Sequence, residues 1–96
     1  MEREEIIRDA VKIIRRHLPA REFEIVLFGS WVRGDARETS DIDIGVAGPK
    51  PVDDVTLLRI KSEIEGIPTL RRIDIVDLSK ADDTFRLEVL NYARPL

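Results

Sequence analysis

The chain has 96 residues, of which 43% are hydrophobic and 36% are charged, with no cysteine and one histidine. This composition excludes disulfide bonds, thiolate metal sites and thiol catalysis, and one histidine cannot build a histidine-based metal cluster. The formal net charge is −3, with no block of lysine or arginine. A basic face that tracks a phosphate backbone, and with it direct nucleic-acid binding, is therefore not expected.

The length predicts a single domain over residues 1–96, because a chain of this size has room for one hydrophobic core. No apolar run approaches the roughly 18 residues that a membrane span needs. The charged N-terminus Met1–Glu5 lacks the pattern of a signal peptide. We therefore expect a cytoplasmic protein without membrane contact.

The first segment predicts an amphipathic helix that Pro19 ends. His17, near the end of this helix, is expected at the surface or in a capping role. Charged residues fill much of one helix face, and hydrophobic residues recur at helical spacing on the other. The hydrophobic positions are Ile6, Ile7, Ala10, Val11, Ile14 and Leu18.

Two strands follow in the prediction, close enough in the chain to be neighbours in one sheet. The apolar run from Phe23 to Phe28 is rich in strand formers and ends at Gly29–Ser30. Residues 35–40 make a turn-rich connection. Beyond them, hydrophobic and polar residues alternate over residues 41–46, which is the two-residue period of a strand.

The second half of the chain predicts a helix, a strand and a helix. Asp53 or Asp54 is placed to cap a helix that ends near Gly66. Its inward-facing residues are expected to be Val55, Leu58 and Ile64. Residues 71–78 predict a third strand, and residues 82–91 a last short helix. The expected packing residues of this last helix are Phe85, Val89 and either Leu90 or Tyr92.

The predicted order is αββαβα. Strands that alternate with helices in this way indicate an α/β fold in which a small mixed β-sheet is covered by helices.

The most informative feature is a set of three carboxylates at strand positions where hydrophobic residues are expected. Asp41 and Asp43 are separated by one residue, so both side chains point to the same face of a strand. Adjacent carboxylates repel each other, and a divalent cation such as Mg²⁺ or Mn²⁺ relieves that repulsion. Asp74 supplies a third carboxylate from another strand, and we prefer it over Asp77, which replaces it if the strand register differs.

Gly29–Ser30 directly follows the first predicted strand. A glycine there lets backbone N–H groups approach a ligand, and the serine can bind a phosphate oxygen. An anion-binding turn and metal-binding carboxylates in one cleft would hold a nucleoside triphosphate with its magnesium. Arg33 is expected either to steer the triphosphate or acceptor, or to pair with Asp35 or Glu38.

Gly29–Ser30, ten intervening residues and then Asp41–Ile42–Asp43 match the signature G-S-x10-D-x-D. On this motif the chain resembles the minimal nucleotidyltransferases of the polymerase-beta-like nucleotidyltransferase superfamily. These small proteins are commonly paired with a helical HEPN partner in toxin–antitoxin operons. The resemblance covers essentially the whole chain.

The resemblance implies a polymerase-beta-like nucleotidyltransferase core and a two-metal mechanism. Asp41 and Asp43 would ligate two Mg²⁺ ions, and Asp74 would complete the catalytic metal site and assist deprotonation of the acceptor hydroxyl. Gly29 and Ser30 would hold the β- and γ-phosphates. The implied protein is an enzyme, a protein adenylyltransferase that moves AMP from ATP to a tyrosine of a HEPN toxin and so acts as its antitoxin.

Two other functions stay open on the sequence alone. One is a non-catalytic binding module that neutralises its partner by occlusion. The other is a nucleotidyltransferase for a small-molecule hydroxyl, which the lack of room for an acceptor domain disfavours. The sequence does not choose the nucleotide base, the acceptor, the number of AMP groups, or between homo- and hetero-oligomers. It also does not decide whether Trp31 packs in the core, stacks on a base or faces a partner.

Overall fold

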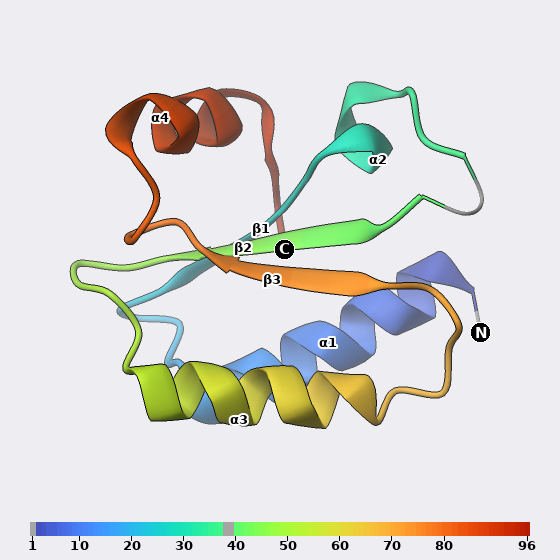
Figure 1. Cartoon of the computed structure of the whole chain (residues 1–96), viewed down its shortest axis with the longest axis horizontal. Helices are drawn as coiled ribbons and strands as arrows, with labels where there is room; N and C mark the ends of the chain where they lie inside the picture. The colour runs from blue at the N-terminus through green and yellow to red at the C-terminus, as the bar shows by residue number, and fades with distance from the viewer. Residues whose placement is uncertain (1, 38–39) are drawn as a thin grey trace.

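In the computed structural model, residues 2–37 and 40–96 are described, and they form a four-stranded sheet with helices on both faces (Figure 1). Helices α1 and α3 lie on one face of the sheet, whereas α2 and α4 lie on the other. The elements are α1 (Arg3–His17), β1 (Glu24–Phe28), α2 (Ser30–Arg33), β2 (Ile42–Ala47), α3 (Asp54–Glu65), β3 (Ile73–Asp77), α4 (Asp83–Tyr92) and β4 (Arg94–Pro95).

The strand order is β3-β2-β1-β4, which leaves β3 and β4 at the two edges. Strand β1 runs antiparallel to both β2 and β4, and β2 runs parallel to β3. The predicted small mixed sheet covered by helices is thus confirmed. The predicted order lacked the four-residue α2 and the two-residue β4, because neither is long enough to show a hydrophobic period.

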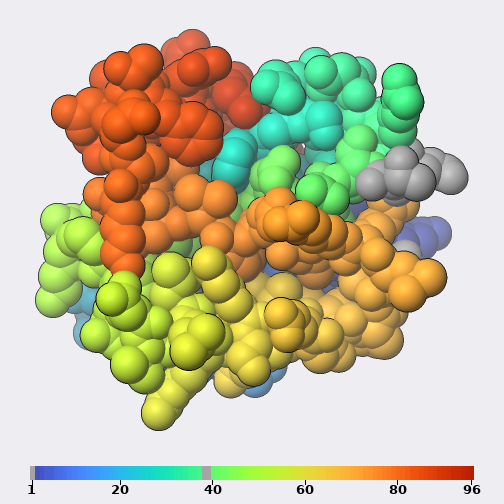
Figure 2. Space-filling model, viewed as in Figure 1, coloured from blue at the N-terminus to red at the C-terminus, as the bar shows by residue number. Residues whose placement is uncertain are grey.

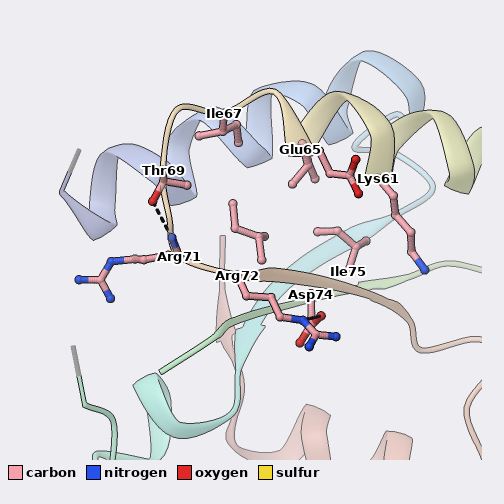
Figure 3. A pocket seen from close by; sticks show the side chains of 10 residues that line it. Lys61, Glu65, Ile67, Thr69, Arg71, Arg72, Asp74 and Ile75 are labelled. Atoms are coloured by element: carbon pink, nitrogen blue, oxygen red, sulfur yellow. Dashed lines mark hydrogen bonds and ion pairs between the residues drawn. The ribbon is translucent and has the colours of Figure 1, made fainter. Parts of the chain in front are cut away.

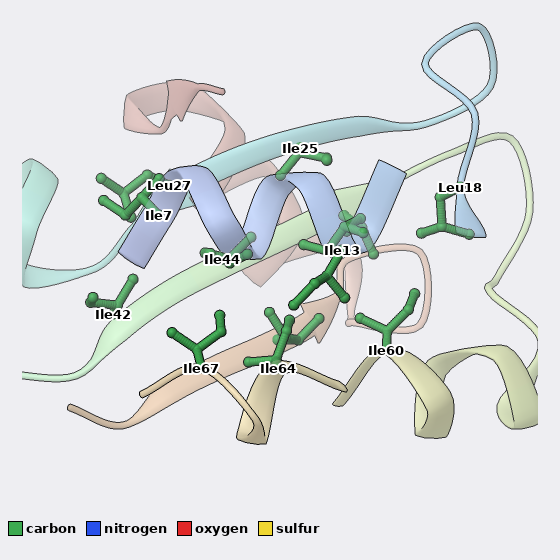
Figure 4. Close-up of a cluster of buried hydrophobic side chains, with 14 of the residues drawn as sticks. Ile7, Ile13, Leu18, Ile25, Leu27, Ile42, Ile44, Ile60, Ile64 and Ile67 are labelled. Carbon is green, nitrogen blue, oxygen red and sulfur yellow. The ribbon is translucent and has the colours of Figure 1, made fainter. Parts of the chain in front are cut away.

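The main core fills the space between the sheet and helices α1 and α3 (Figure 4). Helix α1 buries most of its predicted stripe, although Val11 is only partly buried and Ile13, which the stripe omitted, is buried. Strand β2 sends three fully buried side chains into this core, and they are Ile42, Ile44 and Val46.

Helix α3 presents a different face to this core than predicted. Val55 and Leu58 are 58% and 68% exposed, so the prediction that they face inward is wrong, whereas Ile64 is buried as expected. Asp53 caps the helix by accepting a hydrogen bond from the Thr56 N–H. The face that packs on the core is instead made of positions spaced three and four apart, namely Leu57, Ile60 and Ile64.

The opposite face of the sheet carries a smaller apolar cluster under α4. Its buried members are Val26, Phe28, Leu78 and Val89. Tyr92 packs against this cluster, whereas Leu90 is 38% exposed, so the structure selects Tyr92 from the two predicted residues. Phe85 is 39% exposed and meets the Phe28 ring edge-on at 6.3 Å between centroids. Across the part of the chain that is described, no helix has the length and hydrophobicity to traverse a bilayer.

Candidate active site

The sheet register brings two of the predicted carboxylates side by side. Asp43 of β2 lies opposite Asp74 of the parallel strand β3 and opposite Phe28 of β1. Opposed residues of neighbouring strands share one face of the sheet, so both carboxylates project toward the α4 face. Asp41 precedes β2 by one residue and stands two positions before Asp43, which places it on the same side.

The three carboxylates interact electrostatically. Burial raises the pKa of Asp43 above its ordinary value, and the charges of Asp74 and Asp41 raise it further. The guanidinium groups of Arg33 and Arg72 act in the opposite direction. The negative charges of Asp41 and Asp74 therefore repel the charged form of Asp43, and a bound cation would relieve this repulsion.

Asp77, the alternative to Asp74, has a structural role on the other face of the sheet. Its side chain is buried, its Oδ2 accepts a hydrogen bond from the Val52 N–H at 2.7 Å, and its Oδ1 accepts one from the Ser79 N–H at 3.0 Å. Asp77 thus anchors the segments that flank α3 and β3, and Asp74 is the carboxylate that lies beside Asp43.

The turn at Gly29 links β1 to α2 and lies directly against Asp43. Gly29 has a φ of +78°, and a Cβ atom at this position would lie 2.2 Å from the Asp43 Oδ2 atom. Only glycine fits this backbone conformation and this close approach. The Gly29 N–H donates a hydrogen bond to the Tyr92 hydroxyl at 3.0 Å, and Ser30, half-buried, begins α2.

Arg33 ends α2 at the rim of the site. Its Nε lies 3.8 Å from the Asp35 Oδ1 atom, and both side chains are more than half exposed. The predicted ion pair with Asp35 is therefore present but weak. The other predicted partner, Glu38, lies outside the described residues. Because Arg33 also lines the cleft and lowers the pKa of Asp43, its charge acts on the site as well.

A cleft of about 470 Å³ between α4 and the β1–α2 turn is lined by Gly29, Arg33, Asp43 and Asp74, but not by Ser30 or Asp41. Figure 2 shows the surface hollowed between the red atoms of α4 and the cyan atoms that follow β1. One wall is polar and includes Gly29, Arg33, Asp43, Arg72 and Asp74. The opposite wall is largely apolar and aromatic, and it includes Phe28, Phe85, Val89 and Tyr92.

Sequence reasoning gave no role at the site to several residues of this cleft, Arg72 and Tyr92 among them. Arg72 donates from Nε to the Asp74 Oδ1 atom at 3.0 Å, and its position two residues before Asp74 was an available signal for a shared strand face. Tyr92 contacts Gly29 across 63 positions of the chain, and no local pattern indicates this contact.

Trp31 and His17 both lie outside the cleft. Trp31 lies against the main core, and its indole N–H donates to the Ser40 carbonyl at 3.3 Å. The Arg3 guanidinium lies 4.4 Å from the Trp31 ring centroid, a cation–π distance. His17 pairs with Glu63 at 2.9 Å, which agrees with the surface role expected for it.

The carboxylates do not form a closed metal centre by themselves. Within residues 2–37 and 40–96, no three histidine, aspartate or glutamate side chains converge on a common point. Asp74 turns instead toward Arg72, whose side chain is 73% exposed. The chemistry of the donor set nevertheless fits a hard divalent cation, because Asp41, Asp43 and Asp74 offer only carboxylate oxygens.

The Gly29 turn and the carboxylates of two adjacent strands, Asp43 and Asp74, thus lie together on one wall of the cleft. The chain belongs to the family described as Polymerase beta, Nucleotidyltransferase, whose model matches residues 4–96. The resemblance inferred from the G-S-x10-D-x-D motif is thereby confirmed.

Curated relatives are assigned as protein adenylyltransferases. A protein assigned as the adenylyltransferase MntA of Haemophilus influenzae is 29% identical over 76 residues, which cover 79% of this chain and 66% of that protein. The chain thus matches less than two thirds of that relative. A protein of Methanocaldococcus jannaschii assigned as a protein adenylyltransferase is 30% identical over 89 residues, 93% of this chain and 91% of the relative.

Solved structures share the fold. One described as a candidate minimal nucleotidyltransferase is 32% identical with a TM-score of 0.72, and the match covers 100% of this chain and 97% of that one. A toxin–antitoxin structure with AMP-PNP is 26% identical, with a TM-score of 0.73 and coverages of 98% and 72%. A tri-AMPylated Shewanella oneidensis HEPN toxin in complex with MNT antitoxin gives 21% identity, a TM-score of 0.71 and coverages of 98% and 71%.

Proposed function

We propose that this protein is a Mg²⁺-dependent protein adenylyltransferase that transfers AMP from ATP to a tyrosine hydroxyl of a HEPN-type toxin. In this role it acts as the antitoxin of the pair, in the cytoplasm, where ATP is available. The observation that carries the proposal is the register that sets Asp43 beside Asp74 and against the Gly29 turn. This register supports the proposal because it brings carboxylate oxygens of two strands and the Gly29 turn to one cleft.

Asp41, Asp43 and Asp74 would hold the magnesium, and two ions are expected as in other two-metal transferases. When bound, magnesium neutralises charge on the triphosphate and on the attacking and leaving oxygens. The raised pKa of Asp43 supports this assignment, because a cation compensates the repulsion that the neighbouring carboxylates exert. Arg72 is largely exposed, so it can turn away from Asp74 and free that carboxylate for a ligand.

The remaining steps belong to groups of the chain itself. Ser30 and the backbone of the Gly29 turn bind the β- and γ-phosphates, and the Arg33 guanidinium offsets their charge at the rim. Asp74 assists removal of the proton from the acceptor hydroxyl. The acceptor oxygen then forms a bond to the α-phosphorus as the bond to pyrophosphate breaks in line with it.

The acceptor is proposed to be a protein because the relatives are assigned as protein adenylyltransferases. The relatives assigned as adenylyltransferases support the chemistry. The complexes of similar fold, one with AMP-PNP and one with a tri-AMPylated HEPN toxin, support the nucleotide and the partner class.

The test is transfer of label from α-labelled ATP, in the presence of Mg²⁺, to the protein encoded by the adjacent gene. Asp43→Asn should lower the transfer rate by about a thousandfold, because it removes a carboxylate that the reaction uses directly. Asp54→Asn is the matched control, since Asp54 lies on α3 with a 93% exposed side chain, and it should leave the rate unchanged.

The outcome separates the proposal from its rivals. Full neutralisation of the toxin by Asp43→Asn, with no label transferred by the wild type, would establish occlusion in place of catalysis. Transfer to small-molecule alcohols but never to the partner protein would establish a small-molecule enzyme.

A further inference from the structure

Strand β3 is an edge of the sheet, and no strand of residues 2–37 or 40–96 pairs with its outer side. On its inner side, the Arg72 carbonyl accepts from the Ile42 N–H, and the Leu78 N–H donates to the Val46 carbonyl. Backbone groups of a strand alternate in direction, so the even-numbered residues of β3 bond to β2. Ile73 and Ile75 therefore direct their N–H and carbonyl groups away from the sheet, where another strand can pair with them.

A groove of about 410 Å³ runs beside this open edge, between β3 and α3 (Figure 3). Its floor is apolar and is formed by Ile64, Ile67, Ile73 and Ile75. Positive side chains stand around it, and they are Lys61, Arg71 and Arg72. The only carboxylates among the described lining residues are Glu65 and Asp74, so the lining carries a net positive charge in a chain whose net charge is −3.

The groove is continuous with the candidate active site. Arg72 and Asp74 line both the groove and the cleft, and Figure 3 shows these two side chains paired beside β3. A ligand bound along the groove would therefore have one end next to Asp74 and Asp43.

We propose that the open edge of β3 and this groove bind an extended, acidic segment of the acceptor protein as an added strand, with the acceptor residue opposite Asp74. The proposal rests on the proposed function, because it assigns the site at which the acceptor of that reaction docks. Main-chain pairing supplies the attachment, and the groove supplies the side-chain preference.

The strand geometry fixes where the acceptor residue lies. Neighbouring strands are about 4.8 Å apart, and directly opposed residues share one face of the sheet. A residue opposite Asp74 would extend the row that Asp43 and Asp74 already form, and its side chain would point to the cleft. The residues on either side of it would point to the α3 face and into the groove.

The chemistry of the groove indicates what those neighbours are. Its isoleucine floor accepts apolar side chains directly beside the acceptor residue. Lys61, which is exposed on α3, favours an acidic residue farther along the segment.

Residue-specific amide hydrogen exchange tests the docking mode directly on the wild-type chain, alone and in complex with the protein encoded by the adjacent gene. The Ile73 and Ile75 amides should exchange rapidly in the free chain and at least about tenfold more slowly in the complex. The Asp74 and Val76 amides, already bonded to β2, should be slow in both states. Unchanged exchange of Ile73 and Ile75 on complex formation would overturn the proposal.

The same experiment separates a second copy from the acceptor. If Ile73 and Ile75 are already protected in the free chain, and more strongly at higher protein concentration, the edge is occupied by another copy of the chain and the proposal fails.

A charge reversal tests the groove itself. Lys61→Glu should raise the KM for the acceptor protein by about tenfold, since it replaces an attraction by a repulsion, while kcat and the KM for ATP stay unchanged. Arg59→Glu is the matched control, because Arg59 is exposed on the same helix but does not line the groove. Equal behaviour of the two variants would overturn the groove assignment. Failure of the wild type to transfer AMP would defeat the proposed function, and the exchange pattern would still decide the docking mode.

Discussion

The two faces of the sheet differ in how completely they are covered. The face under α1 and α3 is closed by a continuous isoleucine-rich core, and Ile42, Ile44 and Val46 of β2 are fully buried in it. The face under α4 has only a small cluster, part of which forms a wall of the open cleft. One strand serves both, because alternate residues of β2 point to opposite faces. The stability of the fold is thus concentrated on one face, which leaves the other free to carry repelling carboxylates.

Truncation of matched core residues on the two faces should give the largest effect. Ile44→Ala should lower the free energy of unfolding by about 4 kcal/mol, because it leaves a cavity in the closed core. Val89→Ala under α4 should cost about 2 kcal/mol, because the side chain is smaller and its surroundings are less enclosed. Urea unfolding monitored by circular dichroism measures both losses.

If Ile44→Ala is too unstable to measure, a milder substitution at the same position keeps the test possible. Ile44→Val deletes a single methylene and should cost about 1 kcal/mol, which a domain of this size tolerates. If Val89→Ala destabilises the protein as much as Ile44→Ala does, the two faces share the stability evenly and the comparison is wrong.

The two glycines of positive φ provide a sharper comparison, because only one of them lies against the carboxylates. A Cβ atom at Gly29 would collide with Asp43, whereas a Cβ atom at Gly34, with a φ of +91°, would meet nothing within 4 Å. Both alanine variants should lose about 1 kcal/mol of stability from backbone strain. Gly29→Ala should also lower AMP transfer by about a hundredfold, since Asp43 must leave its position, and Gly34→Ala should not.

Urea unfolding and AMP-transfer assays on the purified Gly29→Ala and Gly34→Ala variants measure both effects. Similar transfer rates for Gly29→Ala and Gly34→Ala would show that the position of Asp43 against the turn does not matter to the reaction.

Most of the closed face of the sheet could be predicted from the sequence. Period-two alternation located β2 and β3, and the α1 stripe was nearly complete, because burial on one side imposes a simple period. The phase of α3 was wrong because Val55 and Leu58 are as apolar as the residues that are buried, so composition alone could not select the face.

The residues of the cleft could be predicted only where they lie close together in the sequence. Gly29, Asp41 and Asp43 belong to one motif, and alternation gave the face of Asp74 relative to Asp77. The contact between Gly29 and Tyr92 depends on how α4 packs over β1, and the open edge of β3 depends on strand order. Both are tertiary properties that no local period encodes.

The smallest expected effect is a pH dependence of stability that has opposite signs on the two sides of the molecule. Asp43 has a pKa that burial and neighbouring carboxylates raise above 3.8, so its protonated form is favoured in the folded state. Stability from this group is present at low pH and is lost as pH rises through the raised pKa. Asp43→Asn should therefore gain stability relative to the wild type as pH rises from about 4.

Asp54 supplies the control of opposite sign. The hydrogen bond and charge of Lys80 lower the pKa of Asp54, so its contribution to stability is present above 3.8 and is lost as pH falls. Asp54→Asn should thus be less stable than the wild type near neutral pH, with the difference closing in acid. Added Mg²⁺ should reduce the advantage of Asp43→Asn, because a bound cation offsets the repulsion that the variant removes. A constant difference between Asp43→Asn and the wild type at every pH would mean that the carboxylates do not repel one another, and the open face would then need another explanation for its sparse packing.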